Sequence, residues 1–137
     1  MSTREAVVLA ALGWVGTPFH DCARVKGAGV DCANLLAAVY TEAGLVDVPE
    51  FGAYSPQWFQ HRDEPLFLSG LAKYAHQVER PQMGDIAMYS FGRHAAHGAI
   101  WVDERTIIHA YKPAGAVVKG DPQPLTPRLD SYWSLYP

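Results

Sequence analysis

Apolar residues dominate the first helical stretch of the chain, residues 6–15. Ser2 precedes this stretch and Glu5 lies three positions after Ser2, which is the spacing of a capping box. Gly16 follows the stretch, and glycine commonly ends a helix. The pattern predicts a first helix that serves packing and carries no chemistry of its own.

A second helical pattern begins after a glycine-flanked turn within residues 29–36. Asp31 is a good N-cap residue and Gly44 supplies the stop. The apolar positions between them recur at helical spacing: Leu35, Leu36, Val39, Tyr40 and Ala43. We therefore predict an amphipathic helix whose first residue is Cys32. The preceding residues, 16–29, are expected to form a loop whose glycines allow close backbone approach.

From Pro81 onward the apolar pattern changes from helical to strand-like spacing. Strands are expected over residues 84–91, 97–102 and 106–111, with a loop over residues 92–96, and residues 116–119 and 131–136 can add two more strands. A third helix that begins near residue 63 is expected to bury Phe67, Leu71 and Tyr74. Helices followed by an antiparallel meander predict an α+β fold in one domain, residues 1–137.

Turn residues and aromatic residues alternate between the second and third predicted helices. The aromatic residues are Phe51, Tyr54, Trp58 and Phe59. They could form one wall of a substrate site, or they could be core that covers the helices.

Composition narrows the class of protein. A hydrophobic content of 49% with 18% charged residues indicates a compact soluble domain, not a disordered chain. The net charge is −3 and the Lys and Arg residues are scattered, so nucleic acid is not an expected partner. No apolar stretch approaches the ~20 residues of a membrane span, and the N-terminus lacks the layout of a signal peptide. We therefore expect synthesis as a cytosolic protein and no membrane association.

Cys32 is the strongest candidate for chemistry. At the first turn of a helix, unpaired N–H groups and the positive end of the helix dipole favour thiolate over thiol. We therefore expect a pKa below the ~8.5 of an ordinary thiol, and Cys32 should be alkylated selectively. The alternative is a buried core cysteine. Cys22 could pair with Cys32, but a chain of this size without visible secretion signals does not need a disulfide.

Two histidines in the predicted strands can supply a base and an orienting group for a cysteine nucleophile. A three-residue turn at residues 103–105 would leave His97 diagonal to His109 on the same face of the sheet, within reach of two imidazole rings. A two-residue turn at residues 103–104 would put them on opposite faces. The alternative is that each histidine is a half-exposed strand residue.

Other polar residues are weaker candidates. Asp31 is expected to be a helix cap, with recognition of a substrate amine as the alternative. His20 and His94 are candidate site residues, with solvated loop histidines as the alternative. A zinc site is a further alternative, and its ligands would be Cys22, Cys32, His94, His97 and His109. We expect no metal or cofactor, because no close pair of cysteines accompanies these histidines.

Four blocks of the sequence resemble the signature blocks of the NlpC-type cell-wall cysteine peptidases, in the family's order and spacing. They are Gly-Val-Asp-Cys at residues 29–32, Pro-Gln-Met-Gly-Asp-Ile at 81–86, His-Gly-Ala-Ile at 97–100 and Ile-His-Ala at 108–110. Residues 16–20, 25–27, 54–58 and 109–111 are similar to the bacteriophage and gene-transfer-particle branch of the family. Many members have Ser-Gly after the cysteine, where this chain has Ala33-Asn34.

The resemblance implies a papain-like NlpC-type fold and hydrolysis of peptide bonds in peptidoglycan stem peptides, commonly the bond from D-glutamate to the diamino acid. It implies that Cys32 is the nucleophile, His97 the base and His109 the third polar residue. Asp31 and His20 are the candidates for contact with the substrate. Many members have a substrate-side tyrosine about a dozen residues before the cysteine, where this chain has Phe19 and His20, so this difference concerns the choice of substrate.

The resemblance to the phage branch also implies a place in a virion or phage-like tail, with tail-tip or hub proteins as partners. Such a partner would bring the enzyme to the cell wall, because no wall-binding module is visible in the sequence. Residues 51–59 and 132–136 are the expected contacts, since aromatic residues are enriched at interface cores. The alternative is a structural tail-tip subunit whose peptidase site is vestigial.

Overall fold

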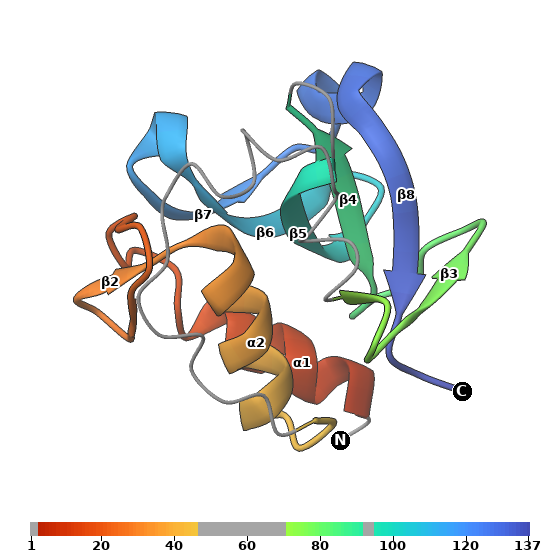
Figure 1. The fold of residues 1–137 in the computed structure, drawn as a ribbon, viewed down its shortest axis with the longest axis horizontal. Coiled ribbons are helices and arrows are strands. Elements are labelled where there is room, and N and C mark those ends of the chain that lie inside the picture. The colour runs from red at the N-terminus through yellow and green to blue at the C-terminus, as the bar shows by residue number, and fades with distance from the viewer. Residues whose placement is uncertain (1–2, 47–70, 92–94) are drawn as a thin grey trace.

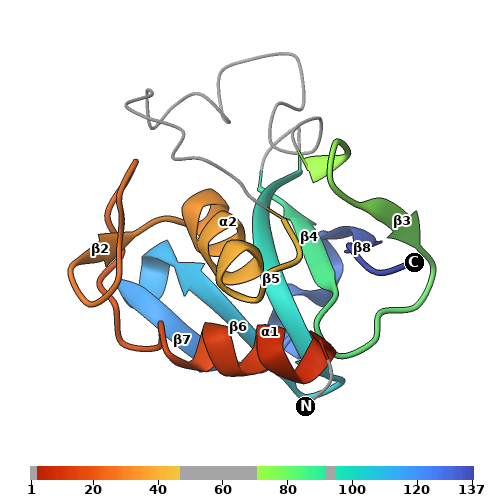
Figure 2. The same ribbon diagram turned by 90° about the horizontal axis from the view of Figure 1, so that it is seen from below.

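Two helices lie together on one side of a six-stranded antiparallel sheet in the computed structural model of the chain (Figures 1 and 2). The structure describes residues 3–46, 71–91 and 95–137. The strand order in the sheet is β3-β8-β4-β5-β6-β7. The α+β class predicted from the sequence is confirmed. The third predicted helix and the aromatic residues at 51–59 lie outside the described residues, except for the end of that helix near Leu71.

Four strands of the sheet follow one another as the predicted meander, and the last strand returns to pair with the first of them. The six strands are β3 (His76–Val78), β4 (Ile86–Ser90), β5 (Ala95–Asp103), β6 (Thr106–Tyr111), β7 (Ala116–Gly120) and β8 (Leu129–Ser134). Strand β8 lies between β3 and β4, far from its chain neighbour β7 (Figure 1). The loop predicted at residues 92–96 extends too far, because β5 already begins at Ala95, which pairs with Ser90 of β4. A bulge between Tyr89 and Ser90 allows this pairing.

Helix α1 (Thr3–Leu12) ends three residues before the predicted position. The amides of Trp14 and Val15 bond the carbonyls three residues back, so tight turns replace the last helical turn up to Gly16, whose φ is +91°. Ser2 lies outside the described residues, so the capping box stays a prediction. Neither described helix is long and apolar enough to cross a membrane.

Helix α2 (Cys32–Glu42) begins and ends as the sequence predicts. It stops in a Schellman motif, in which the amide of Leu45 bonds the carbonyl of Tyr40 and Gly44 adopts a φ of +81°. All residues from Cys32 to Tyr40 are buried, so the predicted amphipathic character is wrong. Three of these residues are alanines, and such small side chains let neighbouring segments approach the helix closely.

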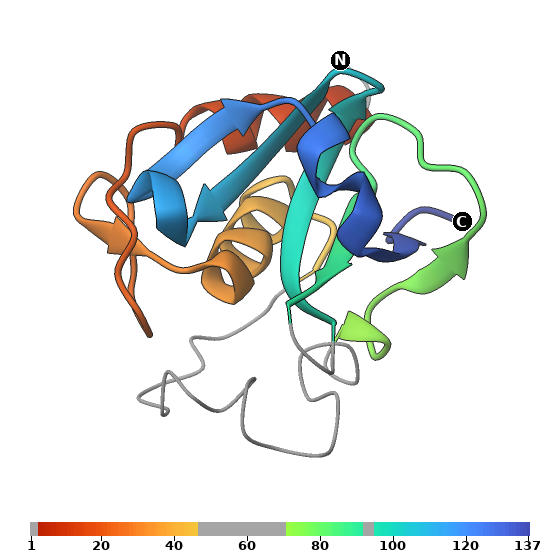
Figure 3. The same cartoon turned by 90° about the horizontal axis from the view of Figure 1, so that it is seen from above.

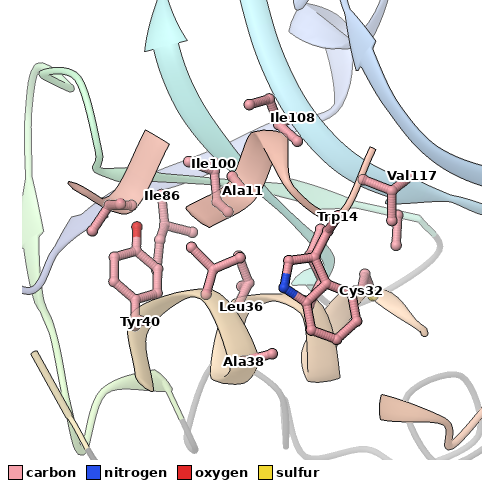
Figure 4. Packing of buried hydrophobic residues seen from close by; sticks show 14 of the residues in the cluster. Ala11, Trp14, Cys32, Leu36, Ala38, Tyr40, Ile86, Ile100, Ile108 and Val117 are labelled. Carbon is pink, nitrogen blue, oxygen red and sulfur yellow. The ribbon is translucent and has the colours of Figure 1, made fainter. Parts of the chain in front are cut away.

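The sheet separates two hydrophobic clusters, because successive side chains of a strand point to opposite faces. The first cluster joins both helices to the sheet, and Figure 4 shows Leu36 and Tyr40 of α2 packed near Ile86 and Ile100. The second cluster contains Ala87, Tyr89, Ala99, Ile107 and Leu125. Tyr74 belongs to neither cluster and is 44% exposed, so its predicted burial is wrong.

The segment before α2 is fastened to the edge strand β7. It contains a short hairpin, β1 (Arg24–Val25) and β2 (Gly29–Val30), that was not predicted and lies beside β7 (Figure 3). The amide of Phe19 bonds the carbonyl of Gly115, and the amide of Val30 bonds the carbonyl of Pro18. The first bond joins this segment to the residue before β7, and the second joins it to the residues directly before α2. The start of α2 is therefore linked to the edge of the sheet.

Candidate active site

Cys32 occupies the first position of α2, where the sequence predicts it. Its side chain is 8% exposed and belongs to the first hydrophobic cluster. The backbone amides of Gly98, Ala33 and Cys32 itself interact with its sulfur. The cysteine is thus both a core residue and a residue at a helix N-terminus, so the two alternatives drawn from the sequence are not exclusive.

The Asp31 carboxylate caps α2 with one oxygen and binds the segment before the helix with the other. Oδ1 accepts hydrogen bonds from the amide of Asn34 at 2.9 Å and from its side-chain Nδ2 at 3.0 Å. Oδ2 accepts a hydrogen bond from the amide of Cys22 at 2.8 Å, and Cys22 has a left-handed φ of +65°. The cap prediction is confirmed. Recognition of a substrate amine by Asp31 stays a prediction.

The electrostatics of Cys32 differ from the sequence-based expectation. Burial, together with the neighbouring Asp31 carboxylate, raises the pKa of the thiol to about 12. The backbone amides lower the pKa, but their effect is smaller. The expected depression of the pKa is therefore wrong, because loss of hydration outweighs the helix N-terminus. The thiol is neutral at neutral pH.

His97 and His109 form a direct, buried hydrogen bond. Nε2 of His97 lies 2.8 Å from Nδ1 of His109, and the ring centroids are 5.0 Å apart. The exposed fractions are 7% and 3%. The prediction that the two histidines share a face is confirmed, and the alternative of half-exposed strand residues is wrong.

A bulge in the β5–β6 hairpin puts the two histidines on one face. Asp103 pairs with Thr106 across a two-residue turn, in which the Asp103 carboxylate accepts a hydrogen bond from the amide of Arg105 at 2.8 Å. Beyond the turn, Trp101 pairs with Ile107, so Val102 is an extra residue. The expected three-residue turn is wrong. The extra residue restores the same register along the rest of the hairpin.

Aromatic side chains surround the two imidazoles. The ring of Phe91 meets His97 edge-on at a centroid distance of 5.6 Å, and Tyr89 lies 6.2 Å away. The ring of Tyr111 stacks on His109. In this setting burial lowers the pKa of His97 to about 3, with a further contribution from His109, and burial lowers the pKa of His109 to about 4. Both histidines are therefore neutral at neutral pH.

Gly98 connects the cysteine to the histidine pair. Its backbone amide interacts with the sulfur of Cys32, and it directly follows His97 in β5. Since glycine has no side chain, the N-terminus of α2 can approach the strand closely at this position. The structure thus brings His97 and His109 together and places Gly98, the residue after His97, against the sulfur of Cys32. Sequence reasoning did not assign a role to Gly98, although its position next to a candidate base was a usable signal.

The remaining candidates lie outside this buried group. His20 is exposed, and its Nδ1 lies 3.1 Å from the carbonyl oxygen of Asp21. His94 lies outside the described residues. Cys22 and Cys32 are both thiols. Among the described residues, no three His, Cys, Asp or Glu side chains come close enough together to hold a metal ion.

The fold is that of NlpC/p60 domains. The NlpC/p60 domain of the peptidoglycan hydrolase SagA aligns with 96% of this chain and 97% of its own length, at a TM-score of 0.64 and 21% identity. An NLP/P60-family protein of Staphylococcus aureus aligns with 98% of this chain, at a TM-score of 0.72 and 18% identity, but this chain covers only 42% of that protein. No protein-family model matches the sequence, and no curated protein matches it.

A mycobacterial enzyme gives a third comparison. The peptidoglycan hydrolase RipB of Mycobacterium tuberculosis aligns with 98% of this chain and 65% of its own length, at a TM-score of 0.67 and 16% identity. At these identities the likeness establishes the NlpC/p60 fold, and the reaction has to be argued from the site.

Proposed function

We propose that this chain is a cysteine peptidase that hydrolyses peptide bonds in peptidoglycan stem peptides. The observation that carries the proposal is the buried 2.8 Å hydrogen bond between His97 and His109. The next residue, Gly98, contacts the sulfur of Cys32 through its backbone amide. A cysteine, an imidazole base and a group that orients the base are the parts of a thiol peptidase. The choice of substrate is supported by the fold, since SagA and RipB are peptidoglycan hydrolases.

The hydrogen bond between the histidines defines the role of each nitrogen. Since Nε2 of His97 faces Nδ1 of His109, Nδ1 of His97 is the nitrogen that remains for the thiol proton. For Nδ1 of His97 to accept that proton, Nε2 of His97 must carry a proton and donate it to His109. His109 is then protonated on Nε2. The pair thus has one tautomer that is competent for catalysis.

Because the thiol and both imidazoles are neutral at rest, proton transfer has to accompany the attack. Nδ1 of His97 takes the proton from Cys32 as the sulfur bonds to the substrate carbonyl carbon. The backbone amide of Cys32 is the natural donor to the oxyanion that forms, and one such donor typically lowers the barrier by ~3–4 kcal/mol. Protonated His97 then gives its proton to the leaving amine, and water hydrolyses the thioester.

The decisive experiment is digestion of purified muropeptides, with release of new amino groups as the readout. The parent protein should cleave them, and Cys32→Ser should lower kcat/KM by at least ~100-fold. Cys22→Ser is the matched control and should keep the parent rate. A folded parent protein that cleaves no muropeptide would overturn the proposal. That outcome would favour the alternative of a structural subunit with a vestigial site, in keeping with the burial of Cys32.

We further propose that the chain works as a component of a phage-like tail tip. This proposal rests on the sequence resemblance at residues 16–20, 25–27, 54–58 and 109–111. It predicts that mass spectrometry of purified particles from the source organism will detect the chain, and its absence from intact particles would contradict the proposal. Tyr136 does not fit the expected contact surface, because it is buried and the Arg4 guanidinium lies 3.9 Å from its ring centroid.

A further inference from the structure

We propose that Tyr111 is a positioning residue that holds the ring of His109 in the orientation that bonds His97. The proposal rests on the proposed peptidase function, because it concerns the histidine pair of that site. It differs from the proposed function in assigning a role to a residue that carries no proton in the reaction.

The ring of Tyr111 covers one face of the His109 imidazole. The two centroids are 4.7 Å apart and the planes are inclined by only 20°, which is a stacked arrangement. Both residues lie on β6, two positions apart, so their side chains leave the same face of the strand. Tyr111 also lies 5.7 Å from the centroid of His97, so it contacts both members of the pair.

The neighbouring strand confines His109 at another point. His109 pairs with Val118 of β7, and Gly120 lies two residues further along that strand. A Cβ atom at Gly120 would lie 3.2 Å from Nε2 of His109, which is closer than most real Cβ contacts. The imidazole thus lies between a stacked ring and a glycine at which an added Cβ atom would crowd its Nε2.

This confinement matters because the two edges of an imidazole are chemically different. A half-turn of the His109 ring about its bond to Cβ would put Cδ2 in the place of Nδ1. Carbon cannot accept the hydrogen bond from Nε2 of His97, so the turned ring would leave His97 without its orienting partner. A stacked aromatic neighbour opposes this rotation, because the turning ring must pass through orientations that lose the parallel contact and push against the neighbouring ring.

The test compares Tyr111→Phe, which keeps the ring, with Tyr111→Leu, which removes it. Tyr132→Leu is the matched control, since Tyr132 is another half-buried tyrosine of the sheet whose ring pairs with Trp101 at 5.6 Å and, among the described residues, makes no ring contact with either histidine. We expect Tyr111→Leu to lower kcat for muropeptide cleavage roughly 3- to 10-fold with little change in KM. Tyr111→Phe and Tyr132→Leu should stay within about twofold of the parent.

A second readout does not depend on activity. In a Cys32→Ala background, nitrogen NMR of the imidazoles should show one tautomer for His109 in the Tyr111→Phe protein and a mixture in the Tyr111→Leu protein. Gly120→Ala, which crowds Nε2 of His109 from the other strand, should disturb the same signals and shows that they report the position of this ring. Tyr111→Met, which also removes the aromatic ring, serves if Tyr111→Leu does not fold. Unchanged His109 signals in the folded variants would overturn the proposal. If the parent cleaves no muropeptide, the NMR result still decides the role of Tyr111.

Discussion

At the scale of single residues, the Asp31 carboxylate stabilises the start of α2 but disfavours ionisation of the adjacent Cys32 thiol. The cap requires a buried carboxylate with three donors, and that same carboxylate raises the pKa of the adjacent thiol. A preformed thiolate is therefore disfavoured, and the base has to act during the attack. In the proposed mechanism, activation of the thiol therefore depends on His97 more than on the helix N-terminus.

The burial of Cys32 changes the expected pattern of alkylation. In the folded protein at neutral pH, iodoacetamide should modify the half-exposed Cys22 faster than the buried, neutral Cys32. Peptide mapping by mass spectrometry over time measures both rates. The denatured protein is the control, and there the two thiols should react at similar rates. Faster modification of Cys32 in the folded protein would contradict the raised pKa.

The two histidines should differ in their importance for turnover. His97→Ala removes the proton acceptor and should lower kcat 100- to 10,000-fold, which is the usual range for a general base. His109→Ala should cost less, and His109→Asn or His109→Gln should recover part of the loss, since an amide oxygen can accept the hydrogen bond from His97. Steady-state kinetics measure these effects. If all three variants at position 109 match the parent, His109 is not the orienting residue.

At the scale of elements, the cap of α2 links the stability of the helix to the segment before it. Asp31→Ala removes the acceptors for Asn34 and for the amide of Cys22, so it should lower the free energy of unfolding by about 2–4 kcal/mol. Asp31→Asn keeps one oxygen and should lose less. Chemical denaturation measures both values.

Glu104→Ala is the control for the cap variants, because Glu104 is an exposed residue of the β5–β6 turn. It should change the free energy of unfolding by no more than about 0.5 kcal/mol. Equal stability of Asp31→Ala and Glu104→Ala would show that the cap contributes nothing.

At the scale of the whole molecule, the buried histidine pair makes stability depend on pH. In the unfolded chain the imidazoles have ordinary pKa values near 6.5, whereas burial lowers the pKa to about 3 for His97 and about 4 for His109. Between pH 4 and 6.5 the unfolded state therefore binds more protons than the native state. The free energy of unfolding should fall as the pH falls through this window.

Denaturation curves of the parent and of His97→Gln between pH 4 and 7.5 test this dependence. Each buried histidine adds at most about 1.4 kcal/mol per pH unit to the slope of the free energy of unfolding against pH. This slope should therefore be shallower for His97→Gln than for the parent. The exposed His20 gives a matched control, and His20→Gln should leave the slope unchanged. Parallel curves for the parent and His97→Gln would contradict the burial of a neutral pair.

Features that depend on residues close together in the sequence could be predicted. The start of α2 at Cys32, its Asp31 cap and its Gly44 stop follow from local hydrogen bonding and backbone conformation. The strands β4 and β6 follow from the alternation of apolar residues, because a strand buries every second side chain. The pairing of His97 with His109 was one of two registers that the sequence allowed.

Only the tertiary structure decided the register and the electrostatics. The bulge at Val102 selects the face that His97 shares with His109, and its sequence carries no signal for an extra residue. The pKa of Cys32 depends on how completely other segments exclude water from α2, which no local pattern reports. The return of β8 between β3 and β4 likewise joins residues distant in the chain. Local propensity thus determined the helices, the strands and the candidate residues. Long-range packing determined the pKa of Cys32 and the contact between His97 and His109.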